Sequence, residues 1–330
     1  MNIAIEERIL IGLFLCYTEP NEIIEELKTE WNAKVHLSTR EKLLIINYSL
    51  SIKDLFPWRD ELSEGIDYEK FCESFLVQPD LFVRLRPGNE QIAKQKLQRA
   101  GIEFNVISDT CLALPNSSKI ENIVELDKEV VVQDYSSQQT AEIFKNFKAQ
   151  TSNLKLSVWD CCAGSGGKSL LLYDINPNID LTVSDRRESI IINLRKRFKQ
   201  AGIEKYKSLV ADLTGDQQEI NNNYNLIIAD VPCTGSGTWS RTPEQLYYFD
   251  EIKIEEYASL QKKIASNIIP HLHAGGYLLY ITCSVFKKEN EEVVEFIKDK
   301  FSLELIKMEL LKGYDKKADT MFITLLHLPE

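Results

Sequence analysis

The spacing of apolar residues changes twice along the chain and separates three stretches. Up to about residue 78, apolar positions recur at intervals of three and four, as in residues 21–34 and 40–50, which predicts a helical region. Residues 1–17 hold a short apolar run with acidic residues where a secretory signal would be basic. We therefore expect a buried amphipathic helix at the start of the chain, and Pro79 closes the region.

The second stretch, residues 79–133, alternates short apolar runs with one or two helical segments. The pattern predicts strands and helices in the order strand 82–86, helix 89–101, strands 102–108 and 111–115, helix 118–126, strand 130–135. This order resembles a small α+β module of the kind that presents a sheet to RNA.

The third stretch, residues 134–330, repeats a β/α rhythm. Its apolar runs predict strands at 155–163, 181–185, 206–212, 225–233 and 275–284, with helical segments between them. Such alternation is typical of an α/β fold with a parallel, doubly wound sheet. No helix separates the last two runs, 303–311 and 321–328, so we expect them to finish the sheet as an antiparallel hairpin.

Composition narrows the class of protein. The 330 residues are 44% hydrophobic and 27% charged, as in ordinary soluble domains, and no apolar run approaches the roughly 18 residues of a membrane span. We expect a cytoplasmic protein without a membrane segment. The seven cysteines are scattered without a C-x-x-C pair, and the four histidines show no metal-ligand spacing, which argues against disulfides and against a metal site.

The net charge of −11 is unlike that of a typical nucleic-acid binder, but basic residues gather in one stretch. They are Arg186, Arg187, Arg195, Lys196, Arg197, Lys199, Lys205 and Lys207. A local basic face is what phosphate binding requires, whatever the total charge. A solvated helix face explains the same residues equally well.

A ligand site is expected beyond the carboxyl ends of the strands in the third stretch. The first of these ends carries the glycine-rich loop CCAGSGGKS (161–169), which fits neither the dinucleotide nor the phosphate-loop pattern. Asp185, Asp212 and Asp230 close the next three strands. Each alone is explained as a helix cap. Together they would repel a pyrophosphate and suit a nucleoside that carries a sulfonium and an amino acid, as S-adenosylmethionine does.

Two cysteines stand at the same edge of the predicted sheet. Cys233 follows Asp230 by three residues, and Cys283 ends the next strand. A buried cysteine is usually a small hydrophobe, but two thiols beside a carboxylate favour covalent chemistry. A thiolate that adds to carbon 6 of cytosine makes carbon 5 nucleophilic toward a methyl donor. Asp230 would then protonate the ring nitrogen N3, and the second thiol is a plausible base. The residues themselves do not rank the two cysteines.

Four segments resemble the RNA 5-methylcytosine methyltransferases of the Sun/Fmu type over residues 79–330. They are VQDYSSQQ (132–139), DCCAGSGGK (160–168), DVPCTGSGTWSRTPE (230–244) and GGYLLYITCSVFKKENEEV (275–293). The resemblance implies a Rossmann-like class I methyltransferase domain with a mixed seven-stranded sheet at 134–330. An RNA-binding-like module at 79–133 and a helical region at 1–78 would precede it.

The resemblance also implies roles for individual residues. Cys283 would be the nucleophile, Cys233 would assist release, and both would act beside Asp230. The S-adenosylmethionine pocket would be lined by Cys162, Ala163, Gly164, Ser165, Gly166, Gly167, Lys168, Asp185, Asp212 and Asp230. Lys168 and Arg241 would contact the substrate. Gly164-Ser165 stands where the family usually has Ala-Pro, which suggests a divergent branch.

The implied partner is RNA, with ribosomal RNA favoured over transfer RNA, and we expect a monomer without a metal. One rival is a DNA cytosine methyltransferase, in which Cys233 would be the nucleophile. The TCS segment at Cys283, the following ENEE and the extra α+β module speak against it. A second rival is a non-catalytic ribosome-assembly factor that has kept the cofactor pocket, although every group that the chemistry needs is present.

Overall fold

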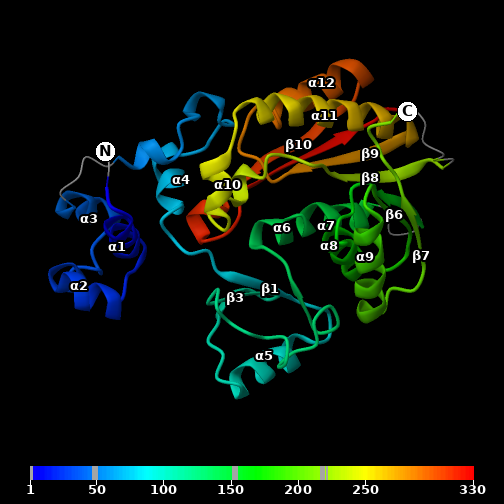
Figure 1. Cartoon of the computed structure of the whole chain (residues 1–330). Coiled ribbons are helices and arrows are strands. Elements are labelled where there is room, and N and C mark those ends of the chain that lie inside the picture. Colours follow the sequence, from blue (N-terminus) through cyan, green and yellow to red (C-terminus); the bar gives the residue numbers. More distant parts are fainter. Residues whose placement is uncertain (1–2, 47–50, 151–154, 216–219, 221) are drawn as a thin grey trace.

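A mixed seven-stranded sheet forms the centre of the larger domain in the computed structural model, which describes residues 3–46, 51–150, 155–215, 220 and 222–330 (Figure 1). Its strands run in the order β10-β11-β9-β8-β5-β6-β7. The bounds are β5 (Leu156–Asp160), β6 (Ile179–Asp185), β7 (Tyr206–Val210), β8 (Tyr224–Asp230), β9 (Leu272–Thr282), β10 (Glu304–Leu311) and β11 (Met321–His327). Neighbours from β7 to β9 are parallel, and β11 pairs antiparallel with both β9 and β10. The predicted α/β class, the mixed sheet and the terminal hairpin are confirmed.

Helices cover both faces of this sheet because the central strands are apolar on both sides. On β8, Leu226 and Ile228 pack toward α7 (Ala141–Gln150), α8 (Gly167–Ile175) and α9 (Glu188–Ala201). The alternate residues Ile227 and Ala229 pack toward α11 (Ile252–Ile268) and α12 (Glu291–Phe301). The two hydrophobic clusters are thus the two sides of one sheet.

The strand order reverses between β5 and β8. The chain runs outward from β5 to β6 and β7, then returns to place β8 on the other side of β5. In doubly wound sheets the loops at such a switch point diverge and leave a crevice beyond the carboxyl ends of the strands. The fold therefore places the loops after β5 and β8 on either side of one crevice.

The smaller module is an antiparallel sheet of order β2-β3-β1-β4 with one helix, α5 (Glu90–Arg99), on one face. Its strands are β1 (Leu81–Leu85), β2 (Asn105–Ser108), β3 (Cys111–Leu114) and β4 (Val130–Val132). The other face is partly covered, because Phe82, Cys111 and Ala113 pack against Ala318 and Tyr135 of the larger domain. This face of β1 and β3 is therefore buried against the larger domain.

Two expected elements of this module are absent or shorter. Residues 118–126 form turns and no helix, and the Glu129 carboxylate accepts the Glu125 N–H at 2.9 Å. The expected strand 130–135 ends at Val132. Asp134 instead caps the short helix α6 (Tyr135–Gln139) by accepting the Ser136 N–H at 2.8 Å.

The N-terminal region divides into two parts that pack differently. The first part holds α1 (Ile5–Cys16), α2 (Glu22–Asn32) and α3 (Thr39–Ile45) around a core of its own. The expected helices agree with these elements, although residues 1–2 and 47–50 lie outside the described part of the chain. No described helix is long and apolar enough to span a bilayer.

The second part, residues 51–76, packs on the larger domain. It contains the 3₁₀ turns η1 (Ile52–Leu55) and η2 (Arg59–Glu61) and the helix α4 (Tyr68–Ser74). The Phe56 ring centroid lies 5.7 Å from that of Phe286 and 6.1 Å from that of Trp239. These two partners stand close after Cys283 and Cys233 in sequence. The region expected as one helical unit thus contributes a segment that supports the loops of both cysteines.

Candidate active site

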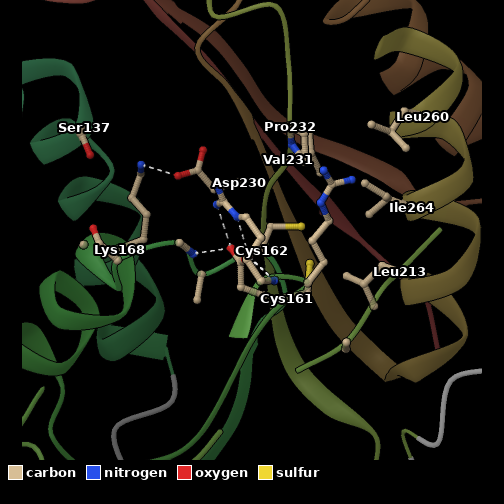
Figure 2. A pocket seen from close by; sticks show the side chains of 18 of the residues that line it. Ser137, Cys161, Cys162, Lys168, Leu213, Asp230, Val231, Pro232, Leu260 and Ile264 are labelled. Carbon is tan, nitrogen blue, oxygen red and sulfur yellow. Dashed lines mark hydrogen bonds and ion pairs between the residues drawn. The ribbon is translucent and has the colours of Figure 1, made fainter. Parts of the chain in front are cut away.

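A cavity of about 770 Å³ opens at the carboxyl edge of the sheet, where the switch point predicts it. Its walls come from the loops after β5, β6, β7 and β8 and from α11. Figure 2 shows Lys168 and Asp230 facing each other on one side of this pocket, with Leu213, Leu260 and Ile264 on the other. The pocket therefore joins a charged wall to an apolar one.

The loop after β5 supplies most of the expected cofactor residues. Cys162, Ala163, Gly164, Ser165, Gly167 and Lys168 all line the cavity. Gly164 has a positive φ of 52°, which glycine adopts without strain and which turns the loop toward α8. The Gly164 N–H donates to Asp185 Oδ2 at 3.2 Å, so the loop is tied to the end of β6.

Gly166 differs from its neighbours because it is not among the residues that line the cavity. Its φ of 83° belongs to the left-handed region, and a Cβ there would lie 2.6 Å from Cε1 of Phe198. Its N–H donates to the Ala163 carbonyl at 2.8 Å. The glycine is required for close packing of the loop on α9, and the structure gives no direct support to its expected cofactor contact.

Asp185 is placed at the cavity by the end of β6, with its side chain almost fully buried. One oxygen, Oδ1, accepts the Arg187 N–H at 2.9 Å and the Arg187 Nε–H at 3.1 Å. The Arg187 side chain is 58% exposed, so it is free to swing into solvent. A ribose hydroxyl can then take its place on the carboxylate.

Asp212 lies two residues beyond β7, at the opposite end of the cavity wall. It is exposed, and its Oδ1 accepts the Thr214 N–H at 3.0 Å and the Thr214 hydroxyl at 2.6 Å. These two hydrogen bonds lower its pKa. The neighbouring apolar wall of Leu213, Leu260 and Ile264 is suited to a planar ring.

Lys168 and Asp230 form a buried ion pair between the glycine loop and the end of β8. Lys168 Nζ lies 2.8 Å from Asp230 Oδ2, and the lysine is 8% exposed. Burial alone would lower the pKa of Lys168, but the neighbouring acidic groups, chiefly Asp230, outweigh it, and the pKa is raised. Lys168 therefore carries its proton and its positive charge in the site.

The two cysteines meet just beyond the cavity. Val231 and Pro232 line the cavity, Cys233 follows them, and the Cys283 N–H donates to Cys233 Sγ at 3.3 Å. Burial, then the charge of Asp230, raises the pKa of Cys283 to about 12. Burial, then the charges of Cys283 and Glu289, raises the pKa of Cys233 well above its usual value. Both sulfurs are thiols at neutral pH in the resting site.

Carboxylates oppose a thiolate at both cysteines. At Cys283 the charge of Asp230 raises the pKa, and the positive charge of Lys168 partly offsets it. At Cys233 the Glu289 carboxylate opposes the thiolate, and backbone N–H groups of Gly235 and Cys283 favour it. The two thiols therefore differ in what offsets the carboxylates, a lysine at Cys283 and backbone N–H groups at Cys233.

Arg241, expected as a substrate contact, is not among the residues that line the cavity. Its Nε donates to Asp319 Oδ1 at 2.6 Å, its Nη2 to Asp134 Oδ2 at 2.8 Å, and its Nη1 to the Asp80 carbonyl at 3.0 Å. The guanidinium thus joins the module, the linker after β4 and the loop before β11. Its described contacts support a structural role.

Several residues of the site were not singled out from the sequence. Glu289 and Asn290 hold the cysteine loops, Asp134 and Asp319 pair with Arg241, and Arg197 donates to the Ser165 hydroxyl at 3.0 Å. Asp134 lies in the segment VQDYSSQQ and Glu289 in the segment KENEE. In both segments an acidic residue with polar neighbours could have indicated a site residue. Arg197 stands in the basic stretch. Both Arg197 and Arg187 form ion pairs.

The donor set fits an S-adenosylmethionine molecule better than a metal. Four carboxylates (Asp134, Asp185, Asp212 and Asp230), a glycine-rich loop and an apolar wall surround a cavity of about 770 Å³, within the usual range for a ligand of that size. Within the described residues, no three His, Cys, Asp or Glu side chains come together as a metal site.

Comparison with known proteins identifies relatives of the larger domain. A family model described as "16S rRNA methyltransferase RsmB/F" matches residues 148–329, more than half of the chain. A ribosomal RNA small subunit methyltransferase B from Photorhabdus laumondii is 27% identical over 170 residues, which cover 51% of this chain and 38% of the relative. The protein of the same name from Xylella fastidiosa is 26% identical over 276 residues, covering 80% of this chain and 62% of the relative. The chain thus spans less than two thirds of either curated relative.

Among solved structures, NSun6 from Pyrococcus horikoshii with SFG is similar over 84% of this chain and 97% of its own. The TM-score is 0.70 and the identity is 14%, so this likeness concerns the fold alone.

Proposed function

The chain belongs to the RsmB/F family of 16S rRNA methyltransferases, and on that premise we propose that it methylates carbon 5 of a cytosine in RNA. The methyl donor is S-adenosylmethionine, and the favoured substrate is small-subunit ribosomal RNA. One observation carries the proposal: the Cys283 N–H donates to Cys233 Sγ at 3.3 Å, next to the Lys168–Asp230 ion pair and at the end of the cofactor-sized cavity.

The cofactor is held by the loop after β5 and by two carboxylates. Asp185 accepts the ribose hydroxyls once Arg187 moves away, and Asp212 with the apolar wall of α11 takes the base. When bound, S-adenosylmethionine supplies a methyl group made electrophilic by the adjacent sulfonium. The negative charges of Asp185, Asp212 and Asp230 along the cavity favour that positive charge.

Cys283 begins the reaction on the base. The Cys283 thiol gives its proton to the neighbouring Asp230 carboxylate, its sulfur forms a bond to carbon 6, and the electrons of the carbon 5–carbon 6 double bond move toward carbon 5 and N3. The Lys168–Asp230 pair contains both a proton and a positive charge, so it stabilises the electron density that arrives at N3. Carbon 5 is then nucleophilic enough to take the methyl group.

Release requires a base. Carbon 5 must lose its proton so that the double bond can re-form while the bond between the Cys283 sulfur and carbon 6 breaks. Cys233 lies beside Cys283, whose N–H donates to Cys233 Sγ at 3.3 Å, and two backbone N–H groups stabilise its thiolate. We assign it this step. Cys233 first gives its own proton to solvent, and its thiolate then takes the carbon 5 proton. Cys283 leaves as a thiolate and recovers its proton from Asp230, so each turnover releases one proton to solvent.

The choice of Cys283 as nucleophile rests on the family resemblance. Carboxylates raise the pKa of both thiols, Asp230 that of Cys283 and Glu289 that of Cys233, while the cation Lys168 favours the thiolate of Cys283. A DNA methyltransferase mechanism would instead use Cys233 for attack.

The proposal is tested by incubating the purified chain with radiolabelled S-adenosylmethionine and total bacterial RNA, followed by bisulfite sequencing. We expect label in the small-subunit ribosomal RNA and a new 5-methylcytosine there. Label in transfer RNA alone would move the substrate assignment to tRNA. Binding of S-adenosylmethionine without transfer to any RNA or DNA would overturn the enzyme and favour an assembly factor. Gel filtration of the same sample tests the expected monomer.

A further inference from the structure

Glu289 is a fully buried carboxylate between the two cysteine loops, just before α12. Its Oε1 accepts the hydroxyls of Thr234 and Ser284, each at 2.6 Å. Its Oε2 accepts the Thr234 N–H at 2.9 Å and the Gln261 Nε2–H at 3.0 Å. Four donors therefore converge on one side chain that the reaction described above does not use.

Two of these partners have a particular place in the sequence. Thr234 directly follows Cys233, and Ser284 directly follows Cys283. We propose that Glu289 is a positioning residue that ties the two cysteine loops together, so that both thiols face the same cytosine. The role rests on the proposed two-cysteine reaction, but the hydrogen bonds that define it are independent of RNA and cofactor.

The contacts around Cys283 extend the same arrangement. Asn290, next to Glu289, accepts the Thr282 hydroxyl at 2.5 Å and donates to the Ser284 carbonyl at 2.9 Å. The Gly237 N–H donates to the Cys283 carbonyl at 2.8 Å, and a Cβ on Gly237 would lie 2.9 Å from that oxygen. Asn290, just before α12, thus fixes the residues on both sides of Cys283. The loop of Cys233 is hydrogen-bonded directly to the Cys283 carbonyl.

The position of Glu289 also has an electrostatic consequence. Burial raises the pKa of the Glu289 carboxyl, while hydrogen bonds from Ser284 and Thr234 oppose the shift and favour the ionised form. The charge of Glu289 in turn raises the pKa of Cys233. Glu289 therefore holds Cys233 in place and favours its thiol form in the resting site.

A purely structural role for Glu289 predicts different behaviour. Buried carboxylates commonly stabilise a fold, and their loss loosens the whole domain. If Glu289 did only this, its replacement would expose all buried thiols together. Cys72 and Cys111 are buried outside the site, so they report such general loosening.

The test compares Glu289→Gln with Glu292→Gln, which changes an exposed glutamate in the first turn of α12. In a Cys283→Ala background, alkylation of Cys233 is followed against pH by mass spectrometry. Removing the negative charge is expected to move the Cys233 profile of Glu289→Gln to lower pH, while Cys72 and Cys111 stay unreactive. The Glu292→Gln profile is expected to be that of the parent.

With Cys283 present, Glu289→Gln is expected to lower kcat by about 10- to 100-fold, because misplaced reacting groups cost that much. The KM for RNA should change less than about threefold, since Glu289 lies away from the surface. Thr234→Val and Ser284→Ala, which each remove one donor, should give smaller losses of kcat. These two variants replace Glu289→Gln in the test if that variant does not fold.

An unchanged kcat, or an unshifted Cys233 profile, would overturn the positioning role. So would alkylation of Cys72 and Cys111 in step with Cys233. The alkylation arm needs neither RNA nor methyl donor. A parent protein without transferase activity would therefore refute the proposed function and leave the test of Glu289 intact.

Discussion

The two halves of the active site are built in opposite ways. In the half that faces the cofactor, Asp212 is exposed and Arg187 is 58% exposed, so polar groups there exchange partners with solvent. In the half that holds the cysteines, Glu289 and Asn290 are fully buried, and their hydrogen bonds are satisfied within the protein. Exposed side chains in the binding half leave a path for a soluble cofactor, whereas the polar groups that hold the cysteines are fixed before the substrate arrives.

The halves also differ in what supports them. The cofactor half is formed by loops of the seven-stranded sheet and by α11. The cysteine half depends in addition on residues 51–76, where Ser63 accepts from Asn290 at 2.8 Å and Phe56 packs on Phe286. Changes in the two halves should therefore separate chemistry from cofactor binding.

The largest effect is expected for Lys168→Met, which breaks the link between the halves. The change leaves Asp230 without its ion-pair partner and Cys283 without its nearby cation. Turnover should fall by about 10²- to 10⁴-fold, the range for losing a group that handles protons. Affinity for S-adenosylmethionine, measured by calorimetry, should change far less. Lys168→Arg keeps the charge and should retain part of the turnover; equal loss in both variants would contradict an electrostatic role.

Phe56→Ala should damage the cysteine half through its support. Phe56 is fully buried, and truncating a buried phenylalanine costs about 3–5 kcal/mol of folding free energy. Denaturant unfolding measures the loss, and Leu44→Ala, at an 88% exposed position of the first helical part, is the control with little expected change. A Phe56→Ala protein as stable as the parent would show that residues 51–76 do not brace the site.

Asp185→Ala should weaken the cofactor half alone. Hydrogen bonds to a charged group are worth about 1.5–3 kcal/mol, so the Kd for S-adenosylmethionine should rise by about 10- to 150-fold. At saturating cofactor, kcat should stay close to that of the parent. Asp180→Ala, a half-exposed aspartate on the same strand, is the matched control. A fall in kcat at saturation with an unchanged Kd would contradict the division of roles.

The smallest effect on the reaction rate is expected from a change of one pH unit. The Cys283 pKa is raised to about 12, so its thiolate fraction at neutral pH is small and grows about tenfold per pH unit below that value. The rate of adduct formation should rise with pH between 6 and 9. The raised pKa also adds stability that is present below the unfolded value of about 8.5 and is lost as pH rises toward 12. A rate independent of pH would require another proton acceptor.

The larger domain could be predicted from the sequence because its strands are long apolar runs that need no distant partner to be recognised. Segments 225–233 and 275–284 became β8 and β9, and the last two runs became the antiparallel pair. The resemblance to the methyltransferase family is likewise confirmed. The features that could not be predicted from the sequence depend on contacts between residues that are distant in sequence. Residues 118–126 have a helical pattern but form turns, in which Glu125 donates a hydrogen bond to Glu129. Phe56 belongs with the larger domain because its ring packs on Phe286.

The site was predictable where a residue stands at the end of a strand. Asp185, Asp230 and Cys283 lie close to strand ends, and the fold brings such ends to one edge. Gly166 and Arg241 could not be placed, because packing on Phe198 and pairing with Asp134 and Asp319 depend on the folded structure. Glu289 could be seen in the sequence as part of an acidic run, but its hydrogen bonds to both cysteine loops depend on the folded structure.

The ranking of the two cysteines is tested most directly by trapping on RNA that contains 5-fluorocytosine. Fluorine at carbon 5 cannot leave as a proton, so the reaction stops with the base bound to the nucleophile. The parent and Cys233→Ala are expected to form a covalent complex that survives denaturing electrophoresis, and Cys283→Ala is expected to form none. A complex that persists in Cys283→Ala and disappears in Cys233→Ala would contradict the assignment of Cys283 as the nucleophile.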